Sequence, residues 1–175
     1  SGMKIAFNTI GCPGWSWERV VEAASRFGMD GVELRGLEGE TELSRIRRFA
    51  PERRGETTEQ LRRQGLELPM VSSGACLGAG FVDMYLEEAR RSLEIAAAVG
   101  ARFMRVLITQ APNPTPANLR QALVLYGELC DQAAEYGIQV LMETNGVLGE
   151  SRVMREFIQR ANRPNGGVLW DIHHT

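Results

Sequence analysis

The sequence predicts an α/β fold, specifically a partial (β/α)8 barrel with about six β/α units, in which parallel strands are covered by outer helices. Short apolar runs alternate with longer helical patterns along the whole chain, which indicates parallel strands joined by right-handed helical crossovers. The strands begin near residues 4, 31, 68, 103, 138 and 167. Each unit therefore takes roughly 30 to 35 residues, close to the ~31 of a 250-residue barrel with eight units.

The elements follow in order along the chain. The expected strands are 4–10, 31–35, 68–73, 103–108, 138–144 and 167–172. The expected helices are 16–27, 42–49, 57–64, 84–99, 116–136 and 151–161. Four glycines follow helical patterns, as expected where a left-handed residue ends a helix: Gly28, Gly65, Gly100 and Gly137. Thr115 before Pro116 is typical of an N-cap followed by proline in the first turn.

A doubly wound fold would show the same alternation of strands and helices. A dinucleotide-binding fold of that class is expected to carry G-x-G-x-x-G after the first strand. The first turn instead reads Gly11-Cys12-Pro13-Gly14-Trp15, which favours the barrel.

Six parallel strands cannot close with eight-strand geometry, so we expect open sheet edges that permit homo-oligomers or strand exchange. The chain stops three residues after the sixth expected strand, at Thr175. We therefore expect a truncated chain, a proteolytic fragment or a split gene product. Residues 1–2 resemble an expression scar, and residues 3–175 are expected to form one incomplete domain.

Composition excludes several classes of function. The net charge of −2 argues against a nucleic-acid surface, and no apolar run approaches the roughly 18 to 20 residues of a membrane helix. The three cysteines, Cys12, Cys76 and Cys130, have no paired spacing, which predicts a reduced, cytoplasmic protein. The single lysine, Lys4, opens the first strand, away from the expected chemistry, which weakens a Schiff-base aldolase interpretation.

Polar residues gather where the expected strands end, which is where parallel α/β proteins place their chemistry. Glu143 and Asn145 follow the fifth strand, and Asp171, His173 and His174 end the sixth. These side chains offer oxygen and nitrogen ligands that suit Mn²⁺, Mg²⁺, Co²⁺ or Zn²⁺. A hydrogen-bonded turn at Asp171 explains the same pattern equally well. At the other strand ends, Glu33 and Arg35 could form an ion pair with each other or with Arg105.

Several stretches together resemble the xylose isomerase-like TIM-barrel superfamily, particularly its sugar phosphate isomerase/epimerase group. They are Asn8-Thr9-Ile10-Gly11-Cys12-Pro13-Gly14-Trp15, the segment 28–35, Ala96-Ala97-Ala98-Val99-Gly100-Ala101 with Arg105-Val106, Met142-Glu143-Thr144-Asn145, and the segment 167–174. The resemblance covers essentially the whole chain in order, which makes it more specific than any one motif.

The resemblance implies that Glu143 and Asp171 bind a divalent metal and that His174 faces the substrate. Strict strand alternation would favour His173 instead, whereas a turn after Asp171 favours His174. The family's two remaining metal ligands would follow strands seven and eight and are absent from the sequence, so we expect impaired activity, and a metal site that could be empty, in this 175-residue chain. Asn145 stands where relatives often have a histidine, so it is expected to contact substrate rather than metal.

The resemblance implies isomerisation or epimerisation of a small sugar or polyol by proton transfer next to a carbonyl, with Glu143 as acid/base group and Arg105 as substrate contact. A related dehydratase is an alternative, and so is a non-catalytic ligand-binding fragment. An abasic-site endonuclease would need many histidines and a basic groove, and the sequence has two histidines and a net charge of −2.

Overall fold

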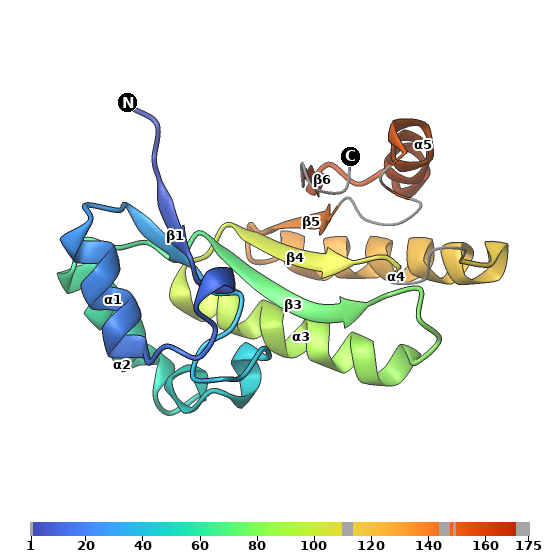
Figure 1. Cartoon of the computed structure of the whole chain (residues 1–175). Coiled ribbons are helices and arrows are strands. Elements are labelled where there is room, and N and C mark those ends of the chain that lie inside the picture. Colours follow the sequence, from blue (N-terminus) through green and yellow to red (C-terminus); the bar gives the residue numbers. More distant parts are fainter. Residues whose placement is uncertain (1, 110–113, 144–147, 149, 171–175) are drawn as a thin grey trace. The chain divides into compact units, whose positions relative to one another are not determined.

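The structure, a computed structural model, describes residues 2–109, 114–143, 148 and 150–170 and confirms the alternation of strands and helices (Figure 1). The chain divides into two units, residues 1–72 with 91–102 and residues 73–90 with 103–175. The strand β3 (Met70–Cys76) and the helix α3 (Val82–Val99) each supply residues to both units. No helix among the described residues is long and apolar enough to cross a membrane.

The first unit is built on two parallel strands, β1 (Ala6–Asn8) and β2 (Gly31–Glu33), in which Asn8 lies opposite Glu33. A short 3-10 turn, η1 (Thr9–Gly11), follows β1, and α1 (Trp17–Arg26) returns the chain to β2. The helix α2 (Arg54–Arg63) lies beside α1 (Figure 1). Trp17 is fully buried there and donates a hydrogen bond of 2.6 Å to the Gln60 side chain.

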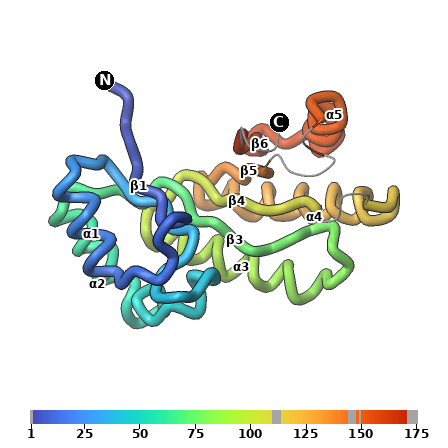
Figure 2. The backbone as a smooth tube through the Cα atoms, in the orientation of Figure 1, coloured from blue at the N-terminus to red at the C-terminus, as the bar shows by residue number. Residues whose placement is uncertain are grey.

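The second unit follows the strand order β3, β4, β5, β6, with β4 (Phe103–Leu107), β5 (Gln139–Glu143) and β6 (Gly166–Leu169). The helices α4 (Pro116–Ala134) and α5 (Ser151–Ala161) carry the chain from one strand to the next (Figure 2). The parallel pairing of β4, β5 and β6 brings their carboxyl ends to one edge.

One buried tyrosine fixes α4 to this sheet. The hydroxyl of Tyr126 donates to the Val140 carbonyl at 2.8 Å and accepts from the Gly167 amide at 3.0 Å. Desolvation by burial raises the pKa of this hydroxyl, so it stays protonated and able to donate.

The predicted helix ends are confirmed. Gly28, Gly65, Gly100 and Gly137 all have positive φ angles, between 65° and 74°. Thr115 caps α4: its hydroxyl accepts from the Asn118 amide at 3.1 Å, and the Asn118 side chain accepts from the Thr115 amide.

The expected helix over residues 42–49 is wrong. The chain forms two 3-10 turns instead, η2 (Leu43–Arg45) and η3 (Arg47–Phe49), and Ile46 between them is extended. The buried residues Leu43, Ile46 and Phe49 recur every third position, which matches the three residues per turn of a 3-10 helix rather than 3.6. The third strand also begins at Met70 rather than at residue 68, after a proline that cannot donate to a ladder.

Candidate functional site

The candidate site in the second unit is a buried ion pair between Arg105 on β4 and Glu143, the last residue of β5. Arg105 Nη1 donates to Glu143 Oε2 at 3.0 Å. The two side chains are 11% and 9% exposed. Buried charged groups need a partner of opposite charge, and the Arg105 guanidinium and the Glu143 carboxylate are partners in this sense.

The strand register explains why the two side chains meet. Arg105 lies opposite Leu141, and residues two apart on a strand share a face of the sheet, so Leu141 and Glu143 lie on the Arg105 side. The arginine side chain is long enough to extend along the strand to the Glu143 carboxylate. The sequence predicted both residues at strand ends. This is right for Glu143, whereas Arg105 lies in the middle of β4, and the sequence did not predict that the two side chains pair.

The other predicted site residues, Asn145, Asp171, His173 and His174, lie outside the described residues. The sheet register places Leu169, at the end of β6, opposite Glu143. Within the described ranges, no group of three or more His, Cys, Asp or Glu side chains is close enough to hold a metal ion. Of the metal ligands that the resemblance implies, the structure therefore describes Glu143 alone.

A second polar cluster follows β1 and β2 in the first unit. Glu33 accepts from Asn8 Nδ2 and from Arg35 Nε, both at 2.9 Å, which confirms the predicted Glu33–Arg35 pair. The buried hydroxyl of Thr9 accepts from the Arg35 amide and donates to the Gly36 carbonyl. The cluster is well satisfied by its own hydrogen bonds, as expected of a group that orders these strand ends.

One buried carboxylate, that of Glu88, was not predicted from the sequence. Glu88, in the middle of α3, accepts from the Gly74 amide at 2.7 Å and is 6% exposed. A Cβ on Gly74 would lie 2.7 Å from the same carboxylate oxygen, so strand and helix approach closely at this glycine. The signal in the sequence is a glutamate directly beside Ala89, Leu93 and Ala96, which form the buried face of the helix.

Nucleophilic catalysis by a buried cysteine finds no support. Burial raises the pKa of the Cys130 thiol to about 11, and the neighbouring Tyr126 hydroxyl offsets this only in part. A thiol with that pKa is protonated at neutral pH and is a poor nucleophile.

The comparisons with known proteins agree on the fold. A family model described as xylose isomerase-like TIM barrel matches residues 21–175. No curated protein matches the chain. A xylose isomerase-like TIM-barrel protein from Mycobacterium smegmatis, solved in complex with magnesium, is similar with a TM-score of 0.77 and 19% identity over 94% of this chain and 63% of that one.

Two further solved structures are similar over most of this chain. One is a D-allulose 3-epimerase from Methylomonas sp. (TM-score 0.73, 19% identity, 98% of this chain and 64% of that one). The other is AsbF of Bacillus anthracis, described as a probable 3-DHS dehydratase (TM-score 0.76, 18% identity, 97% and 63%). The chain thus spans somewhat under two thirds of the length of these structures. At such identities the likeness concerns the fold.

Proposed function

The chain belongs to the xylose isomerase-like TIM-barrel family, and we propose that it is a divalent-metal-dependent sugar or sugar phosphate isomerase or epimerase. The proposed reaction moves a proton at the carbon next to the carbonyl of an α-hydroxy-carbonyl sugar. The observation that carries the proposal is the buried ion pair between Arg105, in the middle of β4, and Glu143, at the carboxyl end of β5. The similarity to an epimerase that acts on D-allulose supports this reaction class.

Glu143 is the proposed acid/base group. Its carboxylate lies at a strand end and is buried, so it would offer a bound substrate a proton acceptor of fixed position with few competing water molecules. Arg105 balances the charge of this carboxylate and fixes its orientation through Oε2. After it has removed the proton, Glu143 would return it to the neighbouring carbon on the same face, which gives isomerisation; epimerisation at the same carbon would need a second acid group on the opposite face.

The proposed metal ligands are Glu143 and Asp171, and the carboxylate donor that the structure describes at the end of β5 fits a hard divalent cation such as Mn²⁺, Mg²⁺, Co²⁺ or Zn²⁺. When bound, such an ion supplies Lewis-acid stabilisation of negative charge on substrate oxygens. The magnesium in the similar Mycobacterium structure supports a divalent cation in this fold. His174, Asn145 and Arg105 are the proposed contacts to substrate hydroxyls, and the proposed partner is a small sugar or polyol.

Turnover of a ketohexose tests the proposal. The chain is incubated with D-allulose and Mn²⁺, and chromatography measures the 3-epimer, D-fructose, and the corresponding aldoses. We expect slow turnover in this chain, with product that disappears with chelator and in Glu143→Gln. Glu128→Gln, the same change at an exposed position on α4, should leave activity unchanged.

The other outcomes separate the alternatives. Full activity in Glu143→Gln would remove this residue from the mechanism. Metal-dependent binding of sugar without turnover would favour a non-catalytic ligand-binding protein. Purification with three zinc ions and cleavage of abasic DNA would favour an endonuclease.

A further inference from the structure

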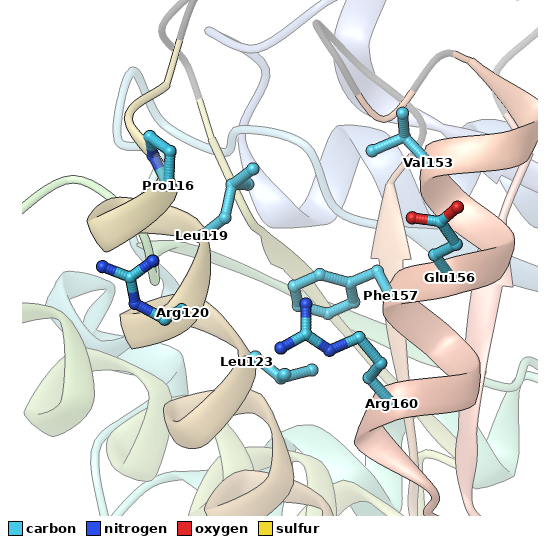
Figure 3. A pocket seen from close by; sticks show the side chains of 8 residues that line it. All are labelled: Pro116, Leu119, Arg120, Leu123, Val153, Glu156, Phe157 and Arg160. Carbon is cyan, nitrogen blue, oxygen red and sulfur yellow. The ribbon is translucent and has the colours of Figure 1, made fainter.

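A groove lies between the outer helices α4 and α5 of the second unit (Figure 3). Its volume is about 210 Å³. That is room for roughly seven waters at ~30 Å³ each, and less than the ~300 Å³ at which pockets for drug-sized ligands begin. The groove is therefore the size of a small organic molecule.

The floor of the groove is apolar and firmly held. Leu119 and Leu123 come from α4, and Val153 and Phe157 come from α5. The Phe157 ring packs edge-to-face against Tyr126, with centroids 5.7 Å apart. The Tyr126 hydroxyl is hydrogen-bonded to backbone groups of β5 and β6, so the Phe157 ring that packs against Tyr126 is held in position before any ligand binds.

The rim of the groove is charged. Arg120 lies on α4, and Glu156 and Arg160 lie on α5. Figure 3 shows the Arg160 guanidinium reaching across the groove toward α4. Within the described part of the chain, neither arginine forms an ion pair, so both guanidinium groups are available to an anion; the exposed Arg155 is also without one. The two arginines and Glu156 together give the rim a net charge of about +1, while the floor of the groove is apolar.

We propose that this groove is a binding site for a small organic monocarboxylate. The apolar body of the ligand lies on the floor, and its carboxylate accepts hydrogen bonds from Arg160, while Arg120 adds positive charge at the rim. A guanidinium matches a carboxylate in shape and charge and can bind both of its oxygens. A neutral ligand would leave Arg160 without a charged partner, and Glu156 would repel the second charge of a phosphate dianion. The site lies on the helical layer and does not depend on the proposed isomerase function.

Titration with phenylacetate, followed by ¹H–¹⁵N NMR, tests the proposal. For a ligand of this size we expect a Kd on the order of 1 mM, with shifts confined to α4, α5 and the adjoining strand ends. We expect 2-phenylethanol, which keeps the apolar body without the charge, and acetate, which keeps the charge alone, to bind about tenfold more weakly. Inorganic phosphate should also bind more weakly.

Variants of exposed residues assign the contact. Arg160→Ala should weaken phenylacetate binding about tenfold, and Glu156→Gln should strengthen it. Arg155→Ala is the matched control, because it removes the same charge from α5 at an exposed position outside the groove. Equal losses in Arg155→Ala and Arg160→Ala, equal binding of 2-phenylethanol, or no saturable binding of phenylacetate would each overturn the proposal.

Discussion

Removing one partner of the buried Arg105–Glu143 pair should destabilise the protein far more than removing an exposed ion pair does. In Arg105→Met, the Glu143 side chain, which is 9% exposed, loses the guanidinium donor whose Nη1 lies 3.0 Å from Oε2. Breaking a buried pair in this way costs about 3–5 kcal/mol. For a chain of 175 residues, with ~2–4 °C per kcal/mol, this lowers the melting temperature by roughly 6 to 20 °C.

Lys4→Met provides the matched control. It removes the Lys4–Glu67 pair, whose Nζ–Oε1 distance is 2.8 Å but whose side chains are 59% and 51% exposed. Such a pair contributes at most about 1 kcal/mol. The assay is urea unfolding at pH 7, followed by circular dichroism, with a thermal scan of each variant.

A double-mutant cycle with Glu143→Leu completes this test. Because the second change removes the charge left behind by the first, Arg105→Met with Glu143→Leu should be less destabilised than the sum of the single variants, by about 2 kcal/mol or more. A loss in Arg105→Met as small as that in Lys4→Met, or a cycle with additive energies, would refute the claim that the pair acts as a buried unit.

Three other predictions concern the rest of the chain. Gly78→Ala should destabilise the protein by about 1–3 kcal/mol in the same unfolding assay, because its Cβ would lie 2.6 Å from a backbone carbonyl oxygen just after β4; unchanged stability would show that the two segments separate easily. Iodoacetamide at pH 8 should label the partly exposed Cys12 first, because burial raises the pKa of the Cys130 thiol to about 11. Mass spectrometry identifies the labelled cysteines, and labelling of Cys130 in the folded protein would contradict this prediction. The hydrogen bond from Arg62 lowers the pKa of Glu59 from 4.5 to about 2, so this pair contributes stability above pH 4.5 that is lost as the pH falls toward 2. In a carboxyl ¹³C titration, Arg62→Ala should raise the midpoint of the Glu59 titration. An unchanged midpoint would show that Arg62 does not cause the lowered pKa.

Much of the fold could be predicted because its signals are local. Apolar runs, helical periods and glycines such as Gly137 report on a few neighbouring residues, and the structure reproduces them. The prediction of a helix over residues 42–49 failed because eight residues are too few to separate the three-residue period of a 3-10 helix from the 3.6-residue period of an α-helix.

The site was only partly predictable, because it depends on register and packing. The position of Glu143 at a strand end follows from the sequence, but its pairing with Arg105 requires the alignment of β4 with β5. The contact of Glu88 with the Gly74 amide, like the groove beside Phe157, depends on how a helix packs against its neighbours. Helical periodicity reports which face of a helix is buried, but not which partner lies against it.

Exchange of solvent deuterium tests the central claim most directly, namely that Glu143 moves a proton at the carbon next to a sugar carbonyl. The chain is incubated with D-allulose and Mn²⁺ in D₂O, and ¹H NMR follows the signal of the proton on carbon 3. The proposal predicts that this signal decays in the wild-type chain, even where little product accumulates, and that it persists in Glu143→Gln and in the presence of chelator. Decay at an equal rate in wild type and Glu143→Gln would contradict the proposal, as would a signal that persists in both.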